Sequence, residues 1–225
     1  VIRCAANDLG CPTASIQGLY DAFAAGKAKG FTVPAHNLRG MIYDKSRAIF
    51  RTAKAADAGA FIFEIAKSEM GYCDVRPAEY TACVLAAAIK EGYEGPVFIQ
   101  GDHFQFAMKD YQKDPKATTD GIKKLTKEAI EGGFFNIDID SSTLVVLERP
   151  NVLEQQRDNF ERAAELTGFI RGLEPEGVTI SVGGEIGEVG KNNSTVEEFE
   201  QYFKGFQDKF KGRPISKMSV QTGTS

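Results

Sequence analysis

The sequence predicts an α/β fold in which parallel strands alternate with helices, and three observations support it. Short apolar runs recur at intervals of about 30–40 residues, as they do in repeated βαβ units. Between them lie alanine-rich or amphipathic segments whose ends are marked by glycine or proline. Polar residues close several of the apolar runs, which is where parallel sheets carry their functional groups. We therefore expect one parallel sheet with right-handed crossovers.

Six runs are expected to form strands, because they are rich in β-branched and aromatic residues and are bounded by breakers. Pro34 weakens the first run, since proline cannot donate a backbone hydrogen bond to a sheet. The third run follows the break at Gly95-Pro96 and ends on Asp102, with His103 next. The expected strands are residues 31–37, 60–66, 96–102, 134–140, 178–185 and 215–221.

The segments between these strands carry helix signals. Pro77 suits the first turn of a helix, and Ser194 with Glu197 matches the capping-box pattern. Residues 1–14 are expected to be irregular, because Gly10 and Pro12 interrupt them. The expected helices are residues 15–25, 44–58, 77–90, 118–130, 151–172 and 194–210.

Two architectures fit this alternation: an open doubly wound sheet and a (β/α)8 TIM barrel. The barrel is favoured because a barrel directs every strand end to one mouth, whereas an open sheet uses mainly its switch point. A complete barrel takes about 250 residues, and this chain of 225 residues holds about six β/α units. We expect residues 1–225 to form a single barrel domain that lacks its last two units. The polar strand ends are His36-Asn37, Asp102-His103, Asp140 and Glu185.

The composition excludes several classes of protein. A net charge of −4 and the lack of any block of lysine or arginine argue against nucleic-acid binding. No apolar stretch approaches the roughly 18 residues of a membrane span. The four cysteines lack CxxC spacing, so we expect reduced thiols. These features predict a cytoplasmic protein that contacts neither nucleic acid nor membrane.

The polar strand ends offer a metal site. His103, Asp140 and Glu185 could together hold a divalent ion, with a carboxylate such as Asp102 left for proton transfer. Acidic residues at strand ends also serve as helix caps, so the residue types alone leave both interpretations open. Lys67 at the end of the second strand is a weaker candidate, for a Schiff base.

The order of five segments extends this interpretation. They include the strand ending in Asn37, the Asp102-His103 pair and the strand ending in Glu185. In their order they resemble the class II, metal-dependent fructose-bisphosphate and tagatose-bisphosphate aldolases, and the resemblance covers nearly the whole chain. The five segments are residues 33–37, 100–103, 132–142, 181–187 and 220–225.

This resemblance implies a zinc-dependent (β/α)8 lyase of carbohydrate metabolism. Such an enzyme cleaves a ketose bisphosphate reversibly to dihydroxyacetone phosphate and an aldehyde through a metal-stabilised enediolate. It implies Zn2+ as the cofactor, a monovalent cation as a second candidate, and a homodimer or homotetramer. The implied site comprises Asp102 as acid/base, His103, Asp140 and Glu185 as metal residues, and Asn37 and Gly190 as substrate-binding residues.

Two departures from the family pattern matter. The family carries an acid for proton abstraction in the loop after the fifth strand, and here only Glu188 could replace it. The sequence also stops at Ser225, where the family places its second zinc histidine, so we expect the natural chain to continue. His36 is a less favoured substitute ligand.

Two alternatives therefore stay open. One is a metal-dependent sugar-phosphate isomerase or epimerase, because enediolate chemistry needs the same polarised carbonyl. The other is a catalytically silent relative that binds a sugar phosphate or a protein partner.

Overall fold

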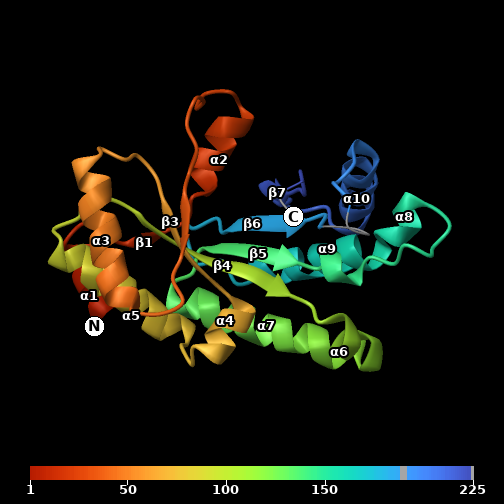
Figure 1. The fold of residues 1–225 in the computed structure, drawn as a ribbon, viewed down its shortest axis with the longest axis horizontal. Coiled ribbons are helices and arrows are strands. Elements are labelled where there is room, and N and C mark those ends of the chain that lie inside the picture. The colour runs from red at the N-terminus through yellow and green to blue at the C-terminus, as the bar shows by residue number, and fades with distance from the viewer. Residues whose placement is uncertain (188–191, 224–225) are drawn as a thin grey trace. The chain divides into compact units, whose positions relative to one another are not determined.

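The computed structural model describes residues 1–187 and 192–223, and these residues form two compact units (Figure 1). The chain passes between the units several times. The expectation of a single domain over residues 1–225 stays a prediction. Unit 1 consists of Val1–Asp102, Glu128–Ile137 and Pro175–Ile180, and unit 2 of His103–Lys127, Asp138–Glu174 and Ser181–Ser225.

Unit 1 is built on parallel strands covered by helices. Strand β3 pairs with β2 on one side and with β4 on the other, in a register that places Ala66 opposite Asp102. The aromatic rings of Phe50, Phe61 and Phe63 form its core, and the centroids of Phe50 and Phe63 are 5.0 Å apart. The elements that lie wholly in unit 1 are α1 (Ile2–Asp8), β1 (Thr13–Ala14), α2 (Gln17–Ala24), β2 (Ala35–Asn37), α3 (Ile42–Ala55), β3 (Ile62–Ala66), α4 (Lys67–Tyr72) and α5 (Pro77–Lys90).

The N-terminal residues are ordered, which corrects the expectation of an irregular segment over residues 1–14. They form helix α1, whose Ala6 is buried, and the short strand β1, which pairs in parallel with the start of β4. The buried side chain of Asn136 holds this strand in place. Its Oδ1 accepts a hydrogen bond from the Ile16 N–H at 2.9 Å, and its Nδ2 donates to the carbonyls of Ala14 at 3.2 Å and Ile99 at 3.0 Å.

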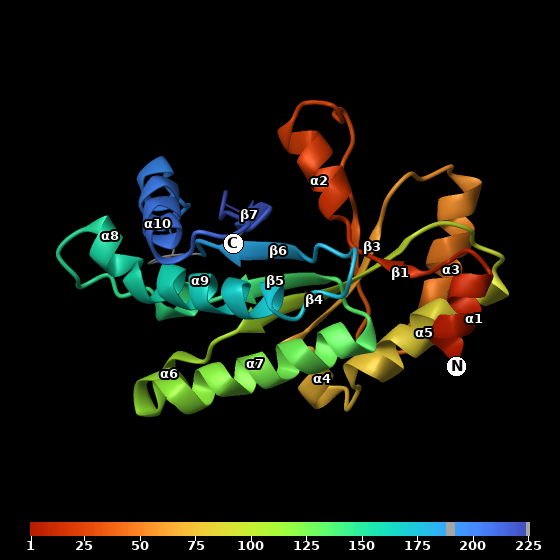
Figure 2. The same ribbon diagram turned by 180° about the vertical axis from the view of Figure 1, so that it is seen from behind.

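Unit 2 consists of strands that are covered by helices. Strands β6 and β7 are parallel, with Glu185 opposite Ser219. Helices α9 and α10 lie side by side (Figure 2), and Gly205 of α10 lets the Phe160 ring of α9 approach its backbone. The elements wholly in unit 2 are α6 (Met108–Lys113), η1 (Ser142–Leu144), α8 (Val152–Gln155), α9 (Arg157–Arg171), β6 (Ser181–Glu185), α10 (Val196–Lys209) and β7 (Lys217–Ser219).

Three elements run from one unit into the other: β4 (Val97–Gln105), α7 (Pro115–Gly132) and β5 (Asn136–Asp140). Along the sheet the strands follow chain order, β2-β3-β4-β5-β6-β7. A doubly wound sheet would reverse this order at a switch point. The expected α/β class with parallel strands is therefore confirmed, whereas closure of a TIM barrel stays a prediction.

Several local expectations need correction. The capping box of α10 is formed by Thr195 and Glu198, one residue later than expected, because Ser194 instead pairs with Gln221. The helix expected over residues 151–172 is divided into α8 and α9 at the buried Gln156. Helices α4 and α6 were not anticipated. Among the described residues, no helix is long and apolar enough to cross a membrane.

Candidate metal centre

Strand β4 changes its alternation where it carries the histidine. Up to residue 101 the odd-numbered side chains, such as Ile99, are buried, whereas after it Phe104 and Phe106 are buried. The change occurs at His103, whose φ of 43° lies in the left-handed region. A left-handed residue inside a strand breaks the extended conformation and so changes the side toward which the following side chains point. As a result neither Asp102 nor His103 enters the buried layer.

Asp140 ends strand β5 and is 2% exposed. Its carboxylate accepts hydrogen bonds on both oxygens. Oδ1 accepts from the Ser142 backbone N–H at 3.1 Å and from the Ser142 hydroxyl at 2.7 Å. Oδ2 accepts from the side-chain amide of Gln105. These donors replace hydrogen bonds that the buried carboxylate would otherwise make with water.

Glu185 ends strand β6, and its side chain is 22% exposed. Its position depends on close packing beneath the strand. The side-chain amide of Asn159 donates to the Glu185 carbonyl at 2.9 Å. At the preceding residue, a Cβ on Gly184 would lie 2.7 Å from the Tyr202 hydroxyl oxygen, so a glycine is needed there. Burial, followed by the nearby carboxylates of Asp140 and Glu185, raises the pKa of Tyr202.

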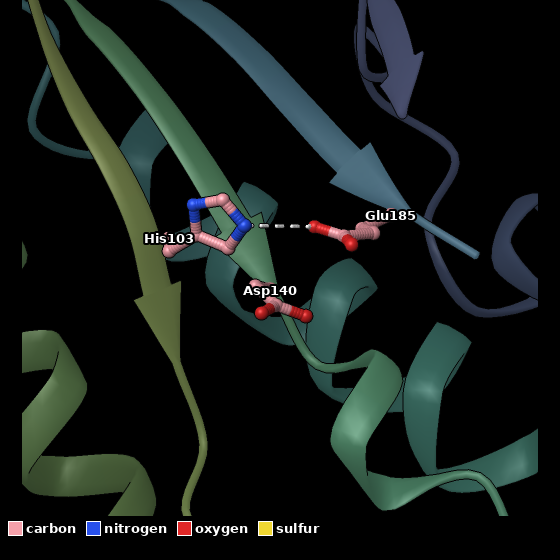
Figure 3. A group of neighbouring side chains, drawn as sticks. All are labelled: His103, Asp140 and Glu185. Atoms are coloured by element: carbon pink, nitrogen blue, oxygen red, sulfur yellow. Dashed lines mark ion pairs between the residues drawn. The ribbon is translucent and has the colours of Figure 1, made fainter. Parts of the chain in front are cut away.

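His103, Asp140 and Glu185 converge from three strands (Figure 3). Each residue offers one ligand atom, and these atoms all lie within 4.8 Å of one another. The His103 Nε2 is 3.7 Å from the Glu185 Oε2. The structure therefore brings together the three residues that the sequence predicted as metal ligands.

This donor set fits a divalent cation. Two ligand atoms of a tetrahedral zinc ion are about 3.4 Å apart. The His103–Glu185 separation of 3.7 Å is close to that value. One imidazole and two carboxylates also suit other divalent transition metals. Three protein ligands would leave a position open, as catalytic zinc sites do.

The sequence also nominated Asn37, Asp102 and Gly190 for the site. Asn37 belongs to unit 1, where its amide donates to Glu69 Oε2 at 2.8 Å. Asp102 also belongs to unit 1, so its role and that of Asn37 stay predictions. Gly190 and Glu188 fall outside the described residues.

His36 is not part of the cluster. Its ring lies against Phe61 and Phe63, with centroids 6.4 Å away from each. Burial lowers its pKa, which favours the neutral imidazole. His36 therefore behaves as part of the aromatic core of unit 1.

Sequence reasoning missed the residues that hold Asp140. Gln105 lies two residues after His103 and Ser142 two residues after Asp140. A spacing of two on a strand places side chains on one face, and this signal could have identified Gln105. Ser142 needs space from Gly187, because a Cβ there would lie 2.5 Å from the Ser142 Oγ.

A second polar pair joins β5 to β7. Asp138 Oδ1 is 2.8 Å from Lys217 Nζ, and the pair spans Gly183 of β6, where a side chain would collide with the Asp138 carboxylate. Asp138 is two residues before Asp140, so the pair lies one step along the strand from the cluster. Lys217 balances the charge of Asp138.

No family model matches the chain, and no curated protein matches it. Among solved structures, a probable tagatose 6 phosphate kinase from Sinorhizobium meliloti 1021 has a similar fold, with a TM-score of 0.59 and 15% identity. The alignment covers 80% of this chain and 45% of that protein, so the chain spans less than half of its length. At this identity the likeness concerns the fold. The resemblance to class II aldolases stays a prediction from sequence motifs.

Proposed function

We propose that this chain carries the metal site of a zinc-dependent class II aldolase that cleaves a phosphorylated ketose to dihydroxyacetone phosphate and an aldehyde. The observation that supports this proposal is the convergence of His103, Asp140 and Glu185. The ordered motifs of the sequence supply the reaction class. The fold neighbour's kinase activity is not part of the proposal, because that likeness is one of fold.

His103 would hold the ion through Nε2, the nitrogen that faces Glu185. Asp140 and Glu185 would supply oxygen ligands and the negative charge that a divalent cation requires. A bound divalent ion would polarise the substrate carbonyl as a Lewis acid. Asp102, adjacent to His103 in the sequence, would be the acid/base that exchanges a proton with the oxygen of the carbonyl that is formed or broken. Asn37 and Gly190 would contact the substrate.

The first test is metal binding, because it requires only the cluster. The chain is stripped with a chelator and titrated with Zn2+ in a calorimeter. We expect one ion per chain, with binding strongly weakened in Glu185→Gln. The control is Glu161→Gln, which removes a carboxylate of similar exposure (24%) that pairs with Lys209. Absence of zinc binding by the unmodified chain would overturn the proposal.

The second test is turnover. Fructose 1,6-bisphosphate is supplied, and triose phosphate is measured before chelation, after it and after zinc is restored. Zinc-dependent release supports an aldolase. Interconversion of ketose phosphates without cleavage would favour the isomerase or epimerase alternative, and metal binding without turnover would favour a silent relative.

A further inference from the structure

We propose that Gln105 and Ser142 are positioning residues that make Asp140 a one-oxygen metal ligand and so limit the site to a low coordination number. This inference rests on the metal site proposed above. It concerns which atom of Asp140 remains available and which residues decide that.

The first oxygen of Asp140 is fully used by the protein. A carboxylate offers about four lone-pair sites, two on each oxygen. Oδ1 accepts two hydrogen bonds from Ser142, at 3.1 Å from the backbone N–H and 2.7 Å from the hydroxyl. Both donors come from one residue, which lies at the start of η1. Oδ1 therefore has no lone pair left for an ion.

The second oxygen of Asp140, Oδ2, accepts one hydrogen bond and so keeps one of its two lone pairs. Oδ2 accepts the side-chain amide of Gln105, which comes from the neighbouring strand β4. Counting donors from residues 1–187 and 192–223, one lone pair of Oδ2 remains for Asp140 to give to a metal. Because Asp140 is 2% exposed, water does not compete strongly for that site.

The surrounding backbone fixes these donors in place. Gly187, at a φ of +79°, allows Ser142 to approach, since any side chain there would collide with it. The left-handed backbone at His103, where the burial alternation of β4 changes, precedes Gln105 by two residues and sets the face on which Gln105 lies. Donors held in this way orient a ligand in advance of metal binding.

The consequence is a restricted choice of metal. One nitrogen of His103, one oxygen of Asp140 and the carboxylate of Glu185 approach the ligand count of a four-coordinate ion with an open position (Figure 3). Ca2+ takes about six to eight oxygen ligands, including bidentate carboxylates, and is disfavoured here. We expect Zn2+ and Co2+ to bind and Ca2+ not to compete.

The test compares Gln105→Met, which keeps the length of the side chain but removes the amide donor, with Ser142→Ala. The matched control is Gln155→Met, which removes an amide that donates to the Leu147 and Arg149 carbonyls of the same unit. Zn2+ affinity is measured by competition with a chromogenic chelator. The visible spectrum of the Co2+-loaded chain reports the coordination number, because four-coordinate Co2+ absorbs far more strongly than six-coordinate Co2+.

We expect Gln105→Met to weaken Zn2+ binding by about 10–100-fold, the usual effect of losing an outer partner of a ligand. The Co2+ spectrum should also lose intensity in this variant, whereas Gln155→Met should match the unmodified chain. Unchanged affinity and spectrum in a folded Gln105→Met would overturn the inference and leave the metal site standing. If Gln105→Met does not fold, Ser142→Ala decides by the same two readouts. Absence of Zn2+ binding by the unmodified chain is a separate result, which overturns the proposed function itself.

Discussion

The left-handed backbone at His103 can be tested by two substitutions that both remove the imidazole, His103→Gly and His103→Ala. A residue with a Cβ loses about 1–2 kcal/mol in the left-handed region, and glycine loses nothing there. Glycine costs about 0.4–1 kcal/mol more than alanine through the entropy of the unfolded chain. At the φ of 43° seen here, the glycine variant should therefore be the more stable of the two.

The expected difference is about 0.5–1 kcal/mol in the free energy of unfolding. For a chain of this size it corresponds to about 1–4 °C in melting temperature. Calorimetry of both variants after treatment with chelator measures it, and urea denaturation checks the free energy. Neither variant should bind Zn2+ tightly, so metal binding does not confound the comparison. An alanine variant as stable as the glycine variant would show that residue 103 is not held in the left-handed region.

Three further predictions follow from other parts of the molecule. Gly205→Ala should destabilise unit 2 by about 1–3 kcal/mol, because the added methyl group would collide with the Phe160 ring. Gly121→Ala, at an exposed helical site, should instead stabilise unit 2 by up to about 1 kcal/mol. Chemical denaturation of both variants measures the contrast, and equal effects would contradict it. Burial lowers the pKa of His36, so below about pH 6.5 the unfolded state binds more protons than the folded state does. The free energy of unfolding should therefore fall on acidification from pH 8 to pH 5, and it should fall less in His36→Gln. Identical pH profiles of the two proteins would refute this. Lys217→Met should lower the free energy of unfolding by about 1–3 kcal/mol, because it removes the cation that pairs with Asp138. Adding Asp138→Asn to this variant should recover part of the loss. A double-mutant cycle that shows no coupling between the two positions would contradict the prediction.

Local sequence signals predicted much of the secondary structure. Helix α5 spans Pro77–Lys90, the range expected from the proline at its start. The capping box shows the limit of such signals, because Ser194 with Glu197 and Thr195 with Glu198 both match the pattern. Only the bond between Ser194 and Gln221, which lies 27 residues away, separates the two.

The contacts that the sequence did not predict are long-range. The short strand β1 has too few residues for a periodic pattern and is defined by its pairing with β4. In the candidate site, the three strand-end residues were predicted because parallel strands bring their ends together. The partnership of Gln105 with Asp140 joins residues 35 apart: the spacing of Gln105 from His103 indicates a shared face, but it does not identify the partner on the next strand.

The anchoring of the N-terminal segment by Asn136 has a consequence for the order of folding. Ile16 and its anchor are separated by 120 residues, so residues 1–16 cannot dock until the segment that carries Asn136 has been made. During synthesis residues 1–16 therefore stay unpaired at first, and unit 1 is complete only after they have paired with the sheet. A substitution at Asn136 would then act on a segment 120 residues away, by prolonging the time for which residues 1–16 are open to proteases.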